Sequence, residues 1–131
     1  MQPQEIIGAC FPNTAQLLQD LSAADTEDAA MDLFMRNGLA SVTEVVLVLR
    51  QLVADACLSN EHEAAEDGRR ILNAWESLGD LITMTATLEE MFGSERSDFR
   101  WKQVFGTYQI AAETMVTGIM RGICAYAPSD N

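Results

Sequence analysis

The sequence predicts an all-α protein, a compact bundle of four or five helices with a long C-terminal helix. Apolar residues recur at steps of three and four along most of the chain, which is the spacing of one helical face. Alternating patterns of β-branched residues, which would indicate strands, are nearly absent. The 131 residues, 48% of them hydrophobic, suffice for a core without disulfides or a metal. We expect one domain over residues 1–131, with a short leading segment at 1–12 and a tail at 128–131.

Proline and helix-capping patterns divide the first part of the chain. Pro12 interrupts the leading segment, and residues 13–16 match a capping box that begins a helix. A second helix is predicted to start at Asp25 or Thr26 and to end at Gly38, because glycine is common just beyond helix ends. These signals give two helices before the centre of the chain.

Two further capping boxes lie in the central part. Ser41 with Glu44 predicts the start of a third helix that runs to about Leu58. Asn60 with Glu63 repeats the pattern and predicts the start of the fourth helix.

The remaining boundaries follow from glycine and proline. The fourth helix is predicted to reach Phe92, with a bend at Gly79 as an option. A loop at residues 93–97 then precedes the last helix, predicted over about residues 98–127 and stopped by Pro128. This last helix is expected to form the spine of the bundle.

The third helix is apolar on two sides. Its main stripe, typical of a core-facing surface, comprises Val42, Val45, Val46, Leu49, Leu52, Val53, Ala56 and Cys57. On the opposite side, Leu47, Ala54 and Leu58 lie together. A helix of this kind is either central in its bundle or covered by a partner. We favour the central position, and a protein interface is the alternative.

The last helix has one apolar face with a row of small residues at its edge. The face comprises Trp101, Val104, Phe105, Tyr108, Ala111, Ala112, Met115, Val116, Ile119, Ile123 and Tyr126. Thr114, Gly118 and Gly122 repeat every four residues, a spacing that permits another helix to approach closely. We expect that helix to belong to the same molecule, and a homodimer with Gly118 and Gly122 at its interface is the alternative.

The fourth helix carries a similar core-facing stripe. It comprises Ile71, Trp75, Leu78, Ile82, Thr85 and Phe92, widened by Leu72, Leu81, Met84, Leu88 and Met91. Trp75 and Trp101 are predicted to anchor the core. The methionines are predicted to be mostly core filler, although their unbranched side chains also suit an adaptable binding surface.

The net charge of −12 is concentrated in one part of the chain. Residues 1–68 contain twelve acids against Arg36 and Arg50, whereas residues 93–131 contain four acids and four bases. Binding to nucleic acid or to an anionic membrane needs clustered Lys and Arg, so both are disfavoured. A partner protein with a basic surface fits the charge better.

Cysteine usage, the first residues and the lack of a membrane-spanning stretch predict a cytoplasmic protein. Cys10, Cys57 and Cys124 are odd in number and far apart, which favours small buried hydrophobes in a reducing compartment. The first residues lack the basic region and apolar run of a signal peptide. No stretch of about eighteen uncharged apolar residues, as a membrane span needs, is present.

The segment 60–67 is the best candidate for chemistry, and it is weak. His62 and Glu66 are four residues apart, and Glu63 with Glu66 forms an ExxE pair. A di-iron bundle would need ExxH motifs and a zinc protease would need a second histidine, and His62 is the only one. Carboxylates are in any case favoured in a first helical turn by the helix dipole. We predict no catalytic, cofactor-binding or metal-binding residue.

These features favour a non-enzymatic regulatory module that binds another protein, such as an inhibitor, antiactivator or adaptor. The predicted interface comprises Leu47, Ala54 and Leu58 as apolar contacts, while the acidic half of the chain steers a basic partner. Two alternatives within binding are a secretion or assembly chaperone and an acidic DNA mimic that inhibits a nucleic-acid-binding protein. The alternative from another class is a carboxylate- or metal-dependent enzyme.

Overall fold

The computed structural model describes residues 3–115, apart from the side chains of residues 3, 4, 6, 7 and 94–98. This part of the chain forms five helices, α1 Pro3–Cys10, α2 Pro12–Ala23, α3 Glu27–Leu58, α4 His62–Phe92 and α5 Ser94–Thr114. The described residues include no strand. The predicted all-α fold of four or five helices is therefore confirmed.

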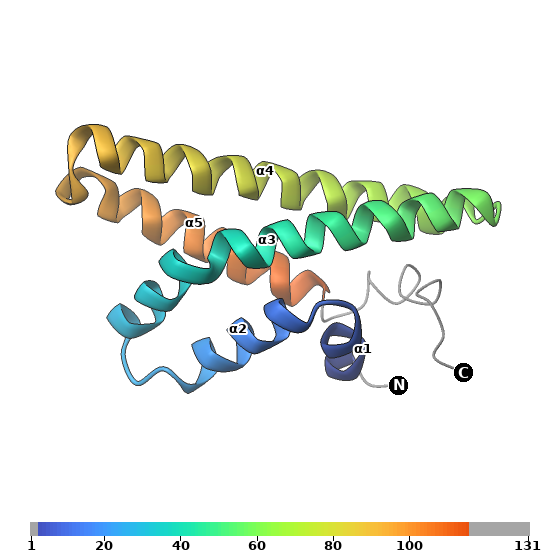
Figure 1. Ribbon diagram of the computed structural model, residues 1–131, viewed down its shortest axis with the longest axis horizontal. Helices are drawn as coiled ribbons and strands as arrows, with labels where there is room; N and C mark the ends of the chain where they lie inside the picture. The colour runs from blue at the N-terminus through green and yellow to red at the C-terminus, as the bar shows by residue number, and fades with distance from the viewer. Residues whose placement is uncertain (1–2, 116–131) are drawn as a thin grey trace.

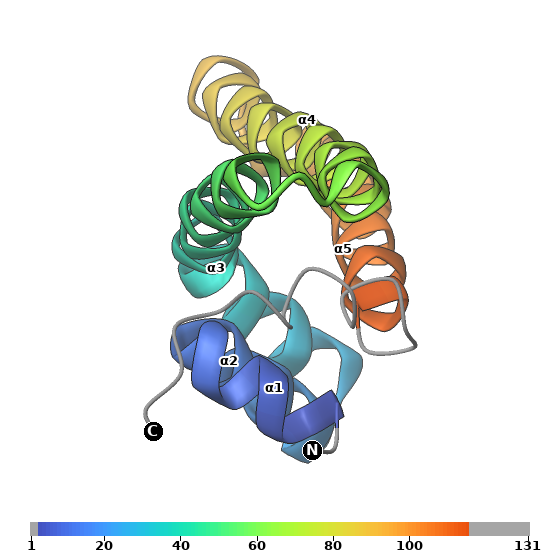
Figure 2. The ribbon, with the colours of Figure 1, turned by 90° about the vertical axis from the view of Figure 1, so that its right-hand side faces the viewer.

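The longest helices, α3 and α4, form an antiparallel hairpin on which the other helices are arranged (Figure 1). α5 returns along α4, α2 lies against the first part of α3, and α1 lies at the start of α2 (Figure 2). The far end of the hairpin extends beyond α1, α2 and the described part of α5 (Figure 1). We call the part of the hairpin on either side of its turn, residues 47–66, the hairpin arm.

The sequence predicted a helix end at Gly38 and a helix start at Ser41, and both predictions are wrong. α3 runs through them without a break. Gly38 is buried because the ring of Phe34 lies within 2.7 Å of the place where a Cβ atom would stand. Ser41 is buried as well, and its hydroxyl bonds to other helices. Both residues serve packing inside one long helix.

The turn between α3 and α4 also differs from its prediction. Asn60 adopts a left-handed backbone with φ 58°, and its N–H donates to the carbonyl of Cys57. The N–H of Glu61 donates to the carbonyl of Ala56 over 2.9 Å. This pair of bonds is a Schellman motif, so Asn60 ends α3 and does not cap α4. At the other end of α3, the predicted helix start at Asp25 or Thr26 is confirmed: Thr26 is the N-cap residue, and its hydroxyl accepts from the N–H of Ala29.

The N-terminus of α2 is capped from a distant part of the sequence. No side chain at its start makes a capping bond, so the predicted box at 13–16 is wrong. The carboxylate of Glu44 instead accepts from the N–H groups of Asn13 and Thr14, at 3.0 and 2.8 Å. Glu44, predicted to cap its own helix, therefore stabilises the positive end of α2 and joins α2 to α3.

The predicted loop at 93–97 reduces to one residue. Gly93, with φ 84°, separates α4 from α5, which starts at Ser94. α4 shows no end at Gly79, which lies close to Val42 of α3. α5 has 21 described residues against 32 in α3 and 31 in α4, so the hairpin, and not the last helix, is the spine. The predicted continuation to residue 127 lies outside the described residues.

Aromatic side chains from three helices form the centre of the core. Phe34 of α3 stacks on Phe105 of α5, with ring centroids 5.0 Å apart, and contacts Trp101 and Tyr108. Trp75 of α4 meets Tyr108 edge-on at 5.7 Å. The prediction that both tryptophans are core anchors is confirmed, because each is at most 4% exposed.

A chain of buried hydroxyls lies beside these rings. The Tyr108 hydroxyl is 2.6 Å from Ser41 Oγ, which is 2.8 Å from Thr14 Oγ1. Thr14 can in turn donate to the Ser41 carbonyl, so one set of proton positions gives every hydroxyl a partner. Burial raises the pKa of Tyr108 to about 12, although its bond to Ser41 opposes the shift and Glu44 adds to it. The chain joins α2, α3 and α5.

Candidate protein-binding surfaces

The structure leaves the predicted apolar patch uncovered. Leu47 and Leu58 are 58% and 83% exposed, and Ala54 between them is exposed as well. α4 covers only the opposite side of this part of α3, so the expected central position is wrong for the hairpin arm. We call Leu47, Ala54 and Leu58 the arm patch. The other two predicted interface residues, Gly118 and Gly122, lie outside the described residues.

Acidic side chains follow the arm patch at the end of the arm. Glu61, Glu63, Glu66 and Asp67 are all exposed in the turn and the first turns of α4. Arg70 lies 3.6 Å from Glu66 and 3.7 Å from Asp67, a loose surface pairing that leaves the group negative. Leu58 therefore stands next to an excess of negative charge.

The two acidic clusters of the sequence lie far apart. Residues 25–32 stand at the start of α3, and residues 61–67 follow its end (Figure 1). A 32-residue helix spans up to about 48 Å at 1.5 Å per residue. The clusters therefore form two separate acidic regions and not one continuous acidic face.

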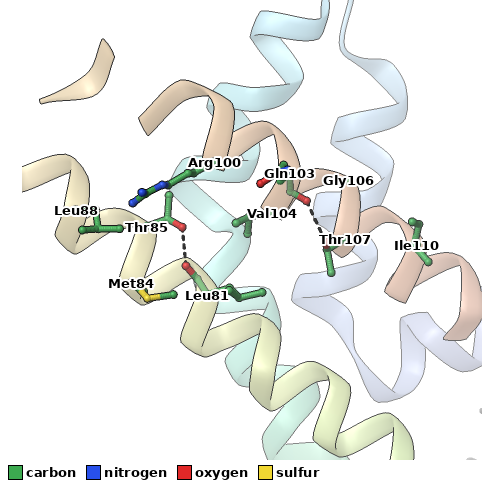
Figure 3. A pocket seen from close by; sticks show the side chains of 10 residues that line it. All are labelled: Leu81, Met84, Thr85, Leu88, Arg100, Gln103, Val104, Gly106, Thr107 and Ile110. Carbon is green, nitrogen blue, oxygen red and sulfur yellow. Dashed lines mark hydrogen bonds between the residues drawn. The ribbon is translucent and has the colours of Figure 1, made fainter. Parts of the chain in front are cut away.

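A second apolar surface, absent from the sequence predictions, is a groove between α4 and α5. It consists of two adjoining hollows of about 870 and 580 Å³, which share Thr107 and Ile110 as lining residues. Figure 3 shows the larger hollow, with Leu81, Met84 and Leu88 on the α4 side. The smaller hollow continues towards Asp67 and Arg70. We call this surface the α4–α5 groove.

The chemistry of the groove is mainly apolar. The hydroxyls of Thr85 and Thr107 bond to carbonyls of their own helices, Leu81 and Gln103, at 2.7 and 3.0 Å (Figure 3). A partner that covers these two hydroxyls therefore does not need to supply a hydrogen-bond acceptor for them. Arg100, at one end, forms no ion pair with any side chain in the part of the chain that the structure describes.

Several groove residues were predicted to be core or were not singled out. Met84 is 52% exposed, and Leu81, Met91 and Phe92 are exposed too. The predicted core-facing stripe of the fourth helix therefore included residues that do not face the core. Among the other methionines, Met115 is buried, Met31 is half-buried, Met35 is exposed and Met120 lies outside the described residues. The prediction that the methionines are mostly core filler is therefore wrong for the described part of the chain.

Ile110 could have been found from the sequence. It lies about 180° around α5 from Trp101 at 100° per residue, so it cannot face the same core. Phe99 lies within about 20° of Ile110 on the same side. The test that identified Leu47, Ala54 and Leu58, an apolar residue opposite a core stripe, applies to α5 as well.

Among the described side chains, the candidate chemistry residues do not assemble into a metal site. His62 is exposed at the start of α4, and the side chains that the structure describes include no group of three potential metal ligands. Cys10 and Cys57 are free thiols, both half-buried, and Arg69 donates to the sulfur of Cys57. Cys124 lies outside the described residues. Within the described helices, none is long and apolar enough to cross a membrane.

Comparison with known proteins gives no relative from which a role can be transferred. No protein-family model matches the chain, and no curated protein or solved structure is similar to it.

Proposed function

We propose that this protein is a non-enzymatic regulatory module that acts by covering the surface of another protein. The observation that carries the proposal is the arm patch, because Leu58 is 83% exposed on a part of the hairpin that projects from the bundle. Leucine at this exposure contributes almost nothing to the fold, whereas an apolar group on a projecting arm can be buried by a partner.

The partner in this proposal is a protein with an apolar site bordered by basic residues. Leu47 and Leu58 make the apolar contact, and Glu61, Glu63 and Glu66 beside them attract the basic border. Attraction of this kind raises the association rate and weakens as salt screens the charges. A bound partner would lose access to its own site, which is the inhibitor, antiactivator or adaptor action.

The test is capture of partners from the native host by wild-type protein and by two variants. The double change Leu47→Asp and Leu58→Asp places charge in the arm patch and should abolish capture of a specific partner. Leu39→Asp, at an exposed leucine of α3 outside the patch, is the matched control and should retain it. Added salt should slow association with the captured partner.

Equal capture by the wild type and the double variant would contradict the proposal. Recovery of an extended client segment would instead support an assembly chaperone, and competition by DNA would support a DNA mimic. A metal or small ligand found by native mass spectrometry, together with turnover, would support the enzyme alternative.

A further inference from the structure

We propose that the α4–α5 groove is the interface of a homodimer in which two copies lie antiparallel. This interface is separate from the arm patch and does not depend on the proposed function. It also differs from the crossing predicted at Gly118 and Gly122.

The uncovered apolar area is what a stable dimer needs. Leu81, Met84 and Ile110 line the groove and are 37–67% exposed. Met91, Phe92 and Phe99 are 55–69% exposed, and at 100° per residue they lie within about 20° of Met84, Leu81 and Ile110 around their helices. These six large side chains therefore lie on the groove side of α4 and α5. At about 200 Å² for a fully exposed large side chain, they leave roughly 700 Å² uncovered. A standard interface buries about 800 Å² on each partner, and monomers rarely expose patches above about 600 Å².

The charge distribution favours a second copy on this face. A chain with a net charge of −12 repels itself wherever two acidic faces approach. The groove is the exception, because the charged residues that line it are Asp67, Arg70 and Arg100. Two copies can therefore meet here without bringing their excess negative charge together.

The ends of the groove set the orientation of the two copies. Arg100 lies in the larger hollow, and Asp67 lies in the smaller one, with Thr107 and Ile110 common to both. A twofold axis through Thr107 and Ile110 reverses the groove onto itself, so it brings Arg100 of each copy towards the other copy's Asp67 end. Glu66 beside Asp67 keeps that end negative despite Arg70. A parallel pair would instead place Arg100 against Arg100.

This arrangement has a consequence for the two hairpin arms. Each arm continues α4 beyond the Asp67 end of the groove, so an antiparallel pair directs its two arms to opposite ends of the dimer. The arm patches stay uncovered, and one dimer presents two of them.

The first experiment measures the oligomeric state of the full chain by sedimentation velocity over a wide range of concentrations. The wild type should sediment as a dimer. Ile110→Asp should weaken dimerisation at least about 100-fold, because the change buries a charge at the twofold axis. Leu58→Asp, an exposed leucine on the arm, is the matched control and should dimerise like the wild type. Far-ultraviolet circular dichroism checks that each variant keeps its helices.

A wild type that stays monomeric at all concentrations would overturn the proposal, as would a dimer that Ile110→Asp leaves intact. If the wild type is monomeric and Ile110→Asp loses a captured partner, the groove binds a different protein and the dimer is wrong.

A charge exchange tests the orientation. Arg100→Glu and Asp67→Arg should each weaken the dimer, and the double variant should recover part of the loss, because each altered residue again meets an opposite charge. If the double variant dimerises no more tightly than the single variant with the weaker dimer, the antiparallel arrangement is overturned.

Discussion

The two ends of α3 have similar sequence patterns and different surroundings. In its first half, Phe34 contacts three aromatic rings of α5, and Ser41 bonds to α2 and α5. Towards the turn, α3 lies beside α4 (Figure 1), and Leu47 and Leu58 stay exposed. An apolar residue opposite a core stripe therefore does not show whether it is buried. Its burial depends on whether a third helix reaches it.

The largest expected effect is the loss of the aromatic centre. Phe34→Ala should lower the free energy of unfolding by about 3–5 kcal/mol, because it leaves a cavity against Phe105, Tyr108 and Trp101. Leu58→Ala on the arm should change it by less than about 0.5 kcal/mol. Urea unfolding measures both, and similar values for the two variants would remove the contrast between the halves of α3.

The next effect is a loss of stability at alkaline pH. Tyr108 has its pKa raised to about 12 in the folded protein, against an ordinary value of 10. Below about pH 10 the residue is neutral in both states, and stability is fully present. Between about pH 10 and 12 the unfolded chain ionises first, so the free energy of unfolding should fall by up to about 3 kcal/mol.

The control for this pH dependence is Tyr108→Phe. The variant keeps the ring and loses the hydroxyl, so it should lack the part of the decline that belongs to Tyr108. Urea unfolding at each pH measures the free energy of unfolding of both proteins. An equal decline in the wild type and the variant would show that Tyr108 ionises normally.

A smaller effect tests the connection between α2 and α3. Glu44→Ala removes the acceptor for two N–H groups at the start of α2 and should cost about 1–2 kcal/mol of unfolding free energy. Glu63→Ala, an exposed carboxylate on the arm, should cost under about 0.5 kcal/mol. Thermal unfolding compares them, and a Glu63 variant as unstable as the Glu44 variant would contradict the cap.

The smallest effect concerns the backbone of the arm. Asn60 has φ 58°, a conformation that glycine adopts freely and alanine does not. Asn60→Ala should therefore lose about 1 kcal/mol of unfolding free energy, whereas Asn60→Gly should lose none. The arm would then depend on its turn geometry more than on its exposed side chains. Equal stabilities of the two variants would contradict this.

Local patterns predicted the helices well and their boundaries poorly. The helical class, the start of a helix at Thr26 and the core positions of Trp75 and Trp101 follow from residue type and spacing within a few turns. Gly38 and Ser41 misled the prediction because each is a common helix-end residue. Inside α3, the ring of Phe34 packs against Gly38. The hydroxyl of Ser41 bonds to the hydroxyls of Thr14 and Tyr108. These contacts explain the presence of both residues inside a helix.

The candidate surfaces were predicted in part. Leu47, Ala54 and Leu58 were singled out because they lie opposite a core stripe, and their exposure could not be read from that pattern. The α4–α5 groove was missed because Leu81 and Met84 lie next to a genuine core stripe on α4. Whether such edge residues are covered depends on how far apart the two helices stand, which spacing along one helix does not encode.

The sequence by itself determined that the chain is helical, where most of its apolar faces lie and that its charge is strongly negative. These properties depend on residues a few positions apart, or on simple sums. Tertiary structure alone decided that Glu44 caps α2, that Tyr108 joins Ser41 and Thr14, and that the arm and the groove remain uncovered. Each of these depends on which helices meet in space, a relation that local spacing and propensity leave open.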